Sequence, residues 1–186
     1  KRELKNMEWG ILITAIILCI IGIVALFSAT QENEYDEFTK QIIWFVVSLI
    51  AMVVVMFIDY NLLVKISPIL YGLFIILLIA VLFTTPINGA TSWFNIGAFS
   101  FQPGEFAKIF VILFLTYTIL KVQRKGQEEI NRITRLLITL STVGLPIILL
   151  VMQPDYGTAL AYIIATALIL FSAGIDKKYI IATILL

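Results

Sequence analysis

The fold is decided by an uncharged apolar run that reads WGILITAIILCIIGIVALFS over residues 9–28. A helix of about 20 apolar residues is long enough to cross the hydrocarbon core of a bilayer. Because backbone in lipid must satisfy its own hydrogen bonds and the run does not alternate, a spanning helix is favoured over a barrel strand. The basic start imitates a secretory signal, but no small-x-small cleavage site clearly ends the run. We interpret it as a retained first helix.

Outward from this run, the rest of the chain repeats the same pattern. Further apolar stretches occupy residues 41–58, 69–85, 104–120, 136–152 and 158–173, and a seventh begins near Tyr179. Of all residues 61% are hydrophobic and only 13% are charged, against about 25% charged in an ordinary soluble domain. The sequence therefore predicts an all-α fold, a polytopic transmembrane helical bundle with about six complete helices and the start of a seventh.

The positive charges predict how this bundle is oriented. If each run crosses the membrane once, one side holds eleven of the thirteen basic residues, namely Lys1, Arg2, Lys5, Lys65, Lys121, Arg124, Lys125, Arg132, Arg135, Lys177 and Lys178. Loops rich in lysine and arginine stay in the cytoplasm. The N-terminus is therefore predicted to be cytoplasmic, and the connections 29–40, 86–103 and 153–157 are predicted to face outside.

The composition excludes several kinds of chemistry from this chain. It has no histidine, and its single cysteine, Cys19, lies inside the first apolar run. The commonest general base and transition-metal ligand are thus missing, and so is any disulfide framework. The thirteen basic and twelve acidic residues nearly cancel, so nothing indicates nucleic-acid binding. Any chemistry must use carboxylates, lysine, hydroxyls or groups outside this chain.

The connection before the fourth apolar run carries polar residues that a simple hairpin does not need. Gln102 is a candidate N-cap, Pro103 suits the first helical position, and Glu105 lies near the positive end of the helix dipole. Glu105 and Lys108 share one helical face at i, i+3. They form either an interfacial ion pair with a snorkelling lysine or part of a binding cavity. Trp93 is either an aromatic-belt anchor or part of the same site.

The connection 153–158, Gln-Pro-Asp-Tyr-Gly-Thr, is the second polar break, and it lies on the same predicted side. Asp155 can simply cap the following helix, with Thr158 in its first turn. Alternatively, Asp155 joins Glu105 and Lys108 in lining a polar cavity for an anionic or sugar-bearing headgroup, with the lysine as a point charge for phosphate. The residues alone leave both interpretations open.

These two segments resemble the two signatures of the SEDS family (shape, elongation, division and sporulation), which includes RodA, FtsW and SpoVE. The matching residues are Gly89, Trp93, Gly97, Gln102, Pro103, Glu105 and Lys108, and then Gln153, Pro154, Asp155, Gly157, Thr158 and Ala159. The segment order and the basic fourth connection also agree with the family. Two positions depart from it: Ser92 stands where many members have arginine, and Gly104 where many have serine.

The resemblance implies that residues 1–186 are the N-terminal part of a single SEDS-type domain of ten helices. The full-length protein is then expected to be a peptidoglycan glycosyltransferase of the bacterial cytoplasmic (inner) membrane. It would polymerise lipid II at the outer face for cell-wall elongation and cell shape, with a RodA-like role preferred over division. A class B penicillin-binding protein is the implied partner, and a divalent cation, Mg or Mn, the implied cofactor.

The resemblance also implies which residues form the site. The candidates for substrate binding are Trp93, Gln102, Glu105, Lys108, Asp155 and Thr158. No catalytic residue is assigned, because the family's proposed catalytic aspartate lies in the outer loop after the seventh helix. Two other functions remain alternatives, a flippase for lipid II or another lipid-linked substrate and a non-catalytic scaffold of a cell-wall synthase complex. The polar residues cluster near the outer helix ends, so a path across the bilayer is not evident.

Overall fold

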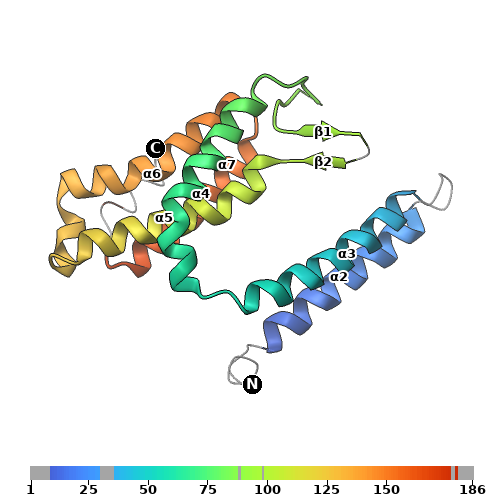
Figure 1. The fold of residues 1–186 in the computed structure, drawn as a ribbon, viewed down its shortest axis with the longest axis horizontal. Coiled ribbons are helices and arrows are strands. Elements are labelled where there is room, and N and C mark those ends of the chain that lie inside the picture. The colour runs from blue at the N-terminus through green and yellow to red at the C-terminus, as the bar shows by residue number, and fades with distance from the viewer. Residues whose placement is uncertain (1–8, 30–35, 88, 98, 177–178, 180–186) are drawn as a thin grey trace. The chain divides into compact units, whose positions relative to one another are not determined.

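The computed structural model describes residues 9–29, 36–87, 89–97, 99–176 and 179 (Figure 1). Within these ranges the chain forms six α-helices, one 3₁₀ helix and one two-stranded sheet. The chain divides into two units, Lys1–Asp59 and Tyr60–Leu186. The prediction of an all-α bundle with six complete helices is confirmed for the described residues. The predicted seventh helix lies outside them, except for Tyr179 itself.

The first unit is a pair of helices, α2 (Trp9–Ala29) and α3 (Asp36–Met56), which pack against each other. The rings of Phe27 and Phe38 approach to 5.2 Å between centroids near the connected ends. No residue of α2 is buried, although almost every residue of this helix is apolar. A helix that is apolar all round and uncovered suits lipid or other spanning helices as its surroundings.

Helix length and composition support a membrane location for both units. The segments Trp9–Ala29, Phe38–Met56, Tyr60–Val81 and Ile133–Met152 are each long and apolar enough to cross a bilayer. A further apolar helix, α7 (Tyr156–Ser172), is shorter, with 17 residues. The first of these segments contains the run that decided the fold from the sequence.

The second unit is a bundle of α4 (Tyr60–Val81), α5 (Pro103–Gln123), α6 (Ile133–Met152) and α7 (Figure 1). Helices α5 and α6 each contact the other three helices, and α5 packs most extensively against α4. Stacked rings of Phe74 and Phe110, 4.8 Å apart, join α4 to α5. The core is formed by apolar side chains from all four helices, including Leu78, Val111, Leu115, Val143, Leu150, Tyr162 and Leu170.

Helix α4 corrects the sequence prediction at both ends. The apolar stretch 69–85 predicted a later helix, but α4 begins at Tyr60 and ends at Val81. Lys65, predicted to lie in a loop, is therefore inside the helix. Pro68 is also inside and cannot donate to the carbonyl of Val64, but the hydroxyl of Ser67 donates to that carbonyl at 2.7 Å. A serine that satisfies the backbone group freed by proline lets the helix continue through this position.

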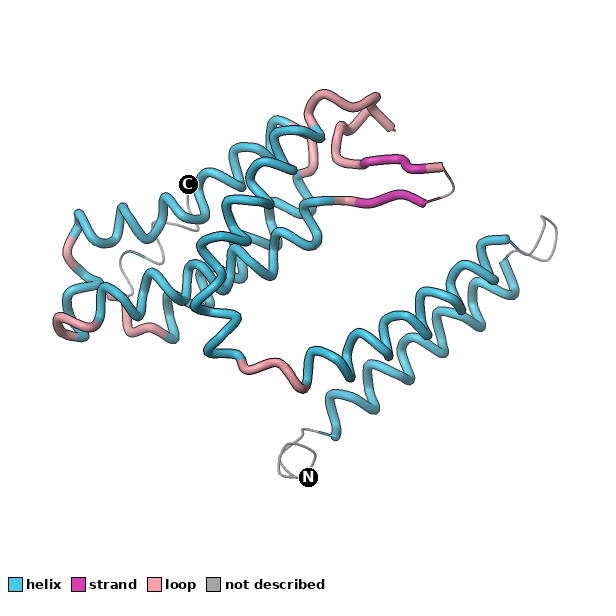
Figure 2. Tube along the Cα trace, in the orientation of Figure 1, coloured by secondary structure: helices cyan, strands magenta, loops and turns pink. Residues whose placement is uncertain are grey.

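A short β-hairpin connects α4 to α5 (Figure 2). Strands β1 (Phe94–Ile96) and β2 (Phe99–Phe101) pair antiparallel, with Phe94 opposite Phe101. The turn between them starts at Gly97, whose φ of +63° is a left-handed conformation that glycine adopts without steric cost. This hairpin was not predicted from the sequence.

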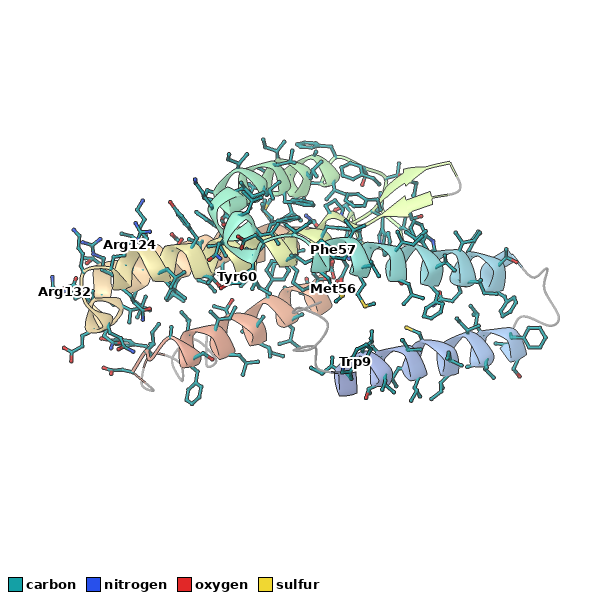
Figure 3. The ribbon with its side chains drawn as sticks, turned by 60° about the horizontal axis from the view of Figure 1, so that its bottom comes forward. Trp9, Met56, Phe57, Tyr60, Arg124 and Arg132 are labelled. Atoms are coloured by element: carbon teal, nitrogen blue, oxygen red, sulfur yellow. The ribbon has the colours of Figure 1, made fainter. Side chains whose placement is uncertain are left out.

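Among the described basic residues of the second unit, all except Lys108 gather at the end of the bundle where α5 passes into α6. A 3₁₀ helix, Gln127–Asn131, makes this connection, and Arg124 and Arg132 flank it (Figure 3). Lys65 of α4 shares a cavity lining with Lys121 of α5 and with Arg124, the C-cap of α5. The β-hairpin leads into the other end of α5, so these basic residues and the polar motifs occupy opposite ends of the same helix.

Candidate functional site

The start of α5 places the first group of candidate residues. Gln102 is the N-cap, with φ −103° and ψ 105°, and Pro103 follows at the first helical position, as predicted. The side chain of Gln102 does not cap the helix. Its Nε2 instead donates to Oδ2 of Asp155 at 2.6 Å, a contact between residues 53 positions apart. The two polar connections therefore meet in space.

Asp155 is the N-cap of α7, which confirms the capping geometry predicted for it. Its Oδ1 accepts from the backbone N–H of Thr158 at 3.2 Å, while its Oδ2 accepts from Gln102. The positive end of the α7 dipole adds to the stability of a carboxylate at this position. Asp155 thus caps one helix and also ties it to the start of another.

Glu105 and Lys108 form the predicted ion pair on one face of α5. The ammonium of Lys108 lies 3.0 Å from Oε1 and 3.1 Å from Oε2 of Glu105. The side chain of Glu105 is 52% exposed and that of Lys108 is 26% exposed, so both remain accessible from outside the bundle. The hydroxyl of Thr158 donates to Oε1 of Glu105 at 3.5 Å, a long contact that extends the pair towards α7.

We call Gln102, Glu105, Lys108, Asp155 and Thr158 the outer polar cluster. It joins the first turns of α5 and α7 and contains two carboxylates, one ammonium, one hydroxyl and one amide. Such a set can donate to and accept from a polar headgroup, and its lysine has three N–H donors to share. Five of the six residues predicted as a site are thereby brought together.

Trp93 is the sixth predicted residue, and it is not linked to the outer polar cluster by any hydrogen bond within the described ranges. It lies half-buried just before β1. The backbone two residues before Trp93 is bonded to the end of α6, because the N–H of Thr91 donates to the carbonyl of Gln153 at 3.3 Å. Ser92, where many family members have arginine, is 2% exposed. The role predicted for Trp93 in substrate binding stays a prediction.

Gly104 lets the first turn of α5 approach α6 and α7 closely. A Cβ at this position would lie 3.0 Å from Cδ2 of Leu150 and 3.4 Å from Cγ2 of Thr158. The carbonyl of Gly104 also accepts from the buried hydroxyl of Tyr162 at 2.8 Å. The glycine that stands in place of the family's serine therefore permits close packing directly beneath the outer polar cluster.

Gln153 is a structural residue that was not among the candidates predicted from the sequence. It is fully buried at the end of α6, and its Nε2 donates to the carbonyl of Leu78 at 2.9 Å. Its Oε1 has no hydrogen-bond partner within the described part of the chain. The signal was present, since Gln153 stands directly before Pro154 and Asp155 in the second motif, but its partner in α4 could not be inferred from spacing.

The described residues contain no group of three histidine, cysteine, aspartate or glutamate side chains that could hold a metal ion. The outer polar cluster offers only two carboxylates, and both already accept hydrogen bonds from neighbouring groups. We therefore assign no metal ligand to these residues. The divalent cation expected from the family resemblance stays a prediction.

The fold and the outer polar cluster define a class, a multi-pass α-helical membrane protein with a polar site between helix ends at one side of its bundle. The family model for FtsW, RodA and SpoVE, described as "Cell cycle protein", matches residues 8–186. The chain belongs to this family, and the resemblance drawn from the two motifs is confirmed.

Individual relatives agree with this assignment. The chain is 33% identical over 189 residues to the peptidoglycan glycosyltransferase RodA of Treponema pallidum (strain Nichols), covering 98% of this chain and 42% of that protein. It superimposes on the crystal structure of the rod shape determining protein RodA of Thermus thermophilus with a TM-score of 0.82 and 26% identity, covering 95% of this chain and 57% of that one.

A second similar structure concerns the coordination of polymerization and crosslinking by a peptidoglycan synthase complex. The chain matches one of its subunits with a TM-score of 0.79 and 27% identity, over 91% of this chain and 48% of that subunit. The chain thus spans about half the length of the relatives it matches.

Proposed function

We propose that the full-length protein is a peptidoglycan glycosyltransferase that polymerises lipid II at the outer face of the bacterial cytoplasmic membrane. The observation that carries this proposal is the bond between Gln102 and Asp155, which unites two motifs 53 residues apart into one polar cluster. The cluster lies at the helix ends that the distribution of basic residues assigns to the outer side. Lipid II presents its disaccharide and pyrophosphate at that side of the membrane.

In this proposal the outer polar cluster binds and orients the lipid II headgroup. Glu105 is half exposed and can accept hydrogen bonds from sugar hydroxyls, while Lys108 can offer its remaining N–H donors to a phosphate oxygen. Asp155 and Thr158 hold the first turn of α7 beside this pair. The reaction transfers the growing glycan from its undecaprenyl pyrophosphate to the 4-hydroxyl of the next sugar.

Residues of the family that are not in this chain complete the proposed machinery. The catalytic aspartate is expected in the outer loop after the seventh helix, and no residue described here is assigned as the general base. A divalent cation and a class B penicillin-binding protein are proposed as cofactor and partner. A RodA-like role in elongation and cell shape is preferred on the structural likeness to a RodA protein, while the sequence identity is equal, at 33%, for a RodA and an FtsW relative.

The structure gives less support to a flippase. A lipid-linked headgroup that crosses the bilayer through this bundle would need a polar path along α5. Between the outer polar cluster and the basic end, the buried face of α5 is instead mostly apolar, with Ala107, Val111, Leu115 and Ile119 in the core. The hydroxyl of the buried Thr118 donates to the carbonyl of Phe114 within the helix. A path through the described bundle is therefore closed by packed side chains.

The test is a reconstitution of purified full-length protein with lipid II and Mg²⁺ or Mn²⁺, with and without the partner. Glycan strands separated on a gel are the expected product, and removal of the cation should abolish them. Movement of lipid II across proteoliposomes without glycan strands would favour the flippase. Partner binding with neither activity would favour the scaffold.

A further inference from the structure

The end of the bundle opposite the outer polar cluster contains a cavity that the proposed reaction does not use. It has a volume of about 530 Å³ and lies between α4 and α5. This is within the size range of about 300–1,000 Å³ typical of small-molecule sites. Its cations are Lys65, Lys121 and Arg124, and its lining contains no carboxylate. We call it the basic cavity.

The charges of the basic cavity are available to a ligand. Lys65, Lys121 and Arg124 are all exposed, and no ion pair joins them to a carboxylate within the described ranges. Lys121 lies 6.0 Å from the centroid of the Tyr117 ring, a contact that does not neutralise its charge. By contrast, the neighbouring Arg132 is paired with Glu129 at 2.9 Å. Three unneutralised cations around one cavity favour an anion.

The rest of the lining is that of an amphiphile site at a membrane surface. Val64 and Leu120 provide apolar wall, and Tyr60 and Tyr117 provide aromatic rings with polar tips. Tyrosines of this kind gather where the bilayer meets water. Leu120 and Tyr60 are 53% and 73% exposed, so the cavity is continuous with the apolar helix surface. A soluble phosphate compound has no acyl chain that could pack against this apolar wall.

We propose that the basic cavity binds an anionic phospholipid of the inner leaflet. The phosphate would lie among Lys65, Lys121 and Arg124, and an acyl chain would follow the apolar groove between α4 and α5 past Val64 and Leu120. Basic pockets between spanning helices at the cytoplasmic surface suit anionic lipid headgroups. The positive-inside distribution assigns this end to the cytoplasmic surface.

A second cavity, of about 680 Å³, adjoins the first and shares Tyr117 and Lys121 with it. It adds Arg135 from α6 and again has no carboxylate in its lining. Because Lys121 belongs to both cavities, a test of the α4–α5 site should leave it unchanged. Lys65 and Arg124 line the first cavity and not the second, so they are the residues to change.

The experiment is native mass spectrometry of delipidated full-length protein with added phosphatidylglycerol, with phosphatidylcholine as the neutral lipid. The variant Lys65→Gln/Arg124→Gln should bind phosphatidylglycerol roughly 30-fold more weakly, since it lacks two surface cations. The matched control Lys125→Gln/Arg132→Gln removes one lysine and one arginine at the same end but outside the cavity lining. It should bind within about twofold of the unchanged protein, since the cavity keeps its cations.

The charge-preserving variant Lys65→Arg/Arg124→Lys should keep the affinity. This result would show that the neutral variant Lys65→Gln/Arg124→Gln loses affinity through its missing charges and not because these two positions tolerate no change. Glycerol 3-phosphate, the headgroup without acyl chains, should not displace the lipid at the same concentration. Equal loss in the two neutral variants, equal binding of phosphatidylcholine, or displacement by glycerol 3-phosphate would each overturn the proposal. None of these measurements involves lipid II, so the result does not depend on the proposed polymerase activity.

Discussion

Asp155 shows at the scale of one residue how the site is constructed. Both of its carboxylate oxygens are engaged, one by the N–H of Thr158 and the other by the amide of Gln102. A helix cap alone needs only the first of these bonds. The second bond fixes α7 to the N-terminal turn of α5, so a local capping residue also determines the geometry of the outer polar cluster.

Substitution of Asp155 separates its structural role from the proposed role of its charge. Asp155→Asn should unfold at nearly the same temperature as the unchanged protein, since asparagine caps as well as aspartate and a flipped Gln102 amide can pair with it. Asp155→Ala should lose about 1–2 kcal/mol of stability with the cap. Thermal unfolding of the purified full-length protein measures both.

The same variants test substrate binding through the rate of lipid II polymerisation. If the negative charge serves the headgroup, Asp155→Asn should fold and reach the membrane but polymerise poorly. A normal rate for this variant would exclude a role for the charge. Equal destabilisation by asparagine and alanine would instead contradict the capping geometry.

Gly104 gives a second prediction at this scale. Gly104→Ala should destabilise the protein by about 1–3 kcal/mol, because the added Cβ would lie 3.0 Å from Leu150 and force it to move. Gly144→Ala is the control, since nothing lies within 4 Å of its Cβ position. That change should be neutral or stabilise α6 by up to about 1 kcal/mol. Similar unfolding temperatures for the two variants would show that α5 is not packed this closely against Leu150 of α6.

The residues of the site differ in how far the sequence could predict them. The Glu105–Lys108 pair and the Asp155 cap depend on spacings of three residues, which helix geometry fixes locally. The Gln102–Asp155 bond spans 53 positions, and the Gln153–Leu78 bond spans 75. Such contacts follow from how helices pack, so no local pattern specifies them.

At the scale of elements, the apolar runs predicted where most helices lie, but polar residues near the interface obscured the start of α4. Asn61, Lys65 and Pro68 all belong to this helix. The β-hairpin had a signal that was not used: in Phe-Asn-Ile-Gly-Ala-Phe-Ser-Phe, residues 94–101, apolar and polar residues alternate around a glycine turn. Segments shorter than a spanning helix need this alternation rather than hydropathy to be recognised.

Gln153 is the link between elements that a substitution can test. Its side-chain Nε2 donates to the backbone carbonyl of Leu78 in the last turn of α4. Its backbone carbonyl accepts from the backbone N–H of Thr91, shortly before the hairpin. Gln153→Ala should destabilise the protein by about 1–3 kcal/mol, because it leaves a buried backbone carbonyl unpaired. The exposed Gln127→Ala, in the 3₁₀ helix, should change the unfolding temperature little. No difference between the two would remove the proposed link between α4 and α6.

For the whole molecule, orientation in the membrane decides whether the outer polar cluster can meet lipid II. The predicted orientation in the membrane rests on the distribution of the basic residues. In a Cys19→Ala background, a cysteine at Asn95 in β1 should react with an impermeant thiol reagent in intact cells, and one at Gln127 should not. Both positions are exposed, so accessibility does not bias the comparison. Labelling at Gln127 but not at Asn95 would invert the topology and remove the cluster from the substrate side.

The central claim is that the outer polar cluster orients lipid II and is more than a structural ion pair. Single substitutions of Glu105 or Lys108 cannot test this, because each leaves an unpaired charge near the membrane surface. The double variant Glu105→Gln/Lys108→Met removes both charges. The chain also offers a matched control, the Glu129–Arg132 pair at the opposite end of the bundle, which has the same i, i+3 spacing.

The most direct measurement is the rate of lipid II polymerisation by these two purified full-length double variants, at equal folded concentration and with a divalent cation. Our account predicts that Glu105→Gln/Lys108→Met folds and binds its partner but polymerises at least about tenfold more slowly, as expected when charge-assisted hydrogen bonds to a substrate are lost. Glu129→Gln/Arg132→Met should retain the unchanged rate. A near-normal rate for the Glu105–Lys108 double variant would contradict the account and leave this pair a structural part of the bundle.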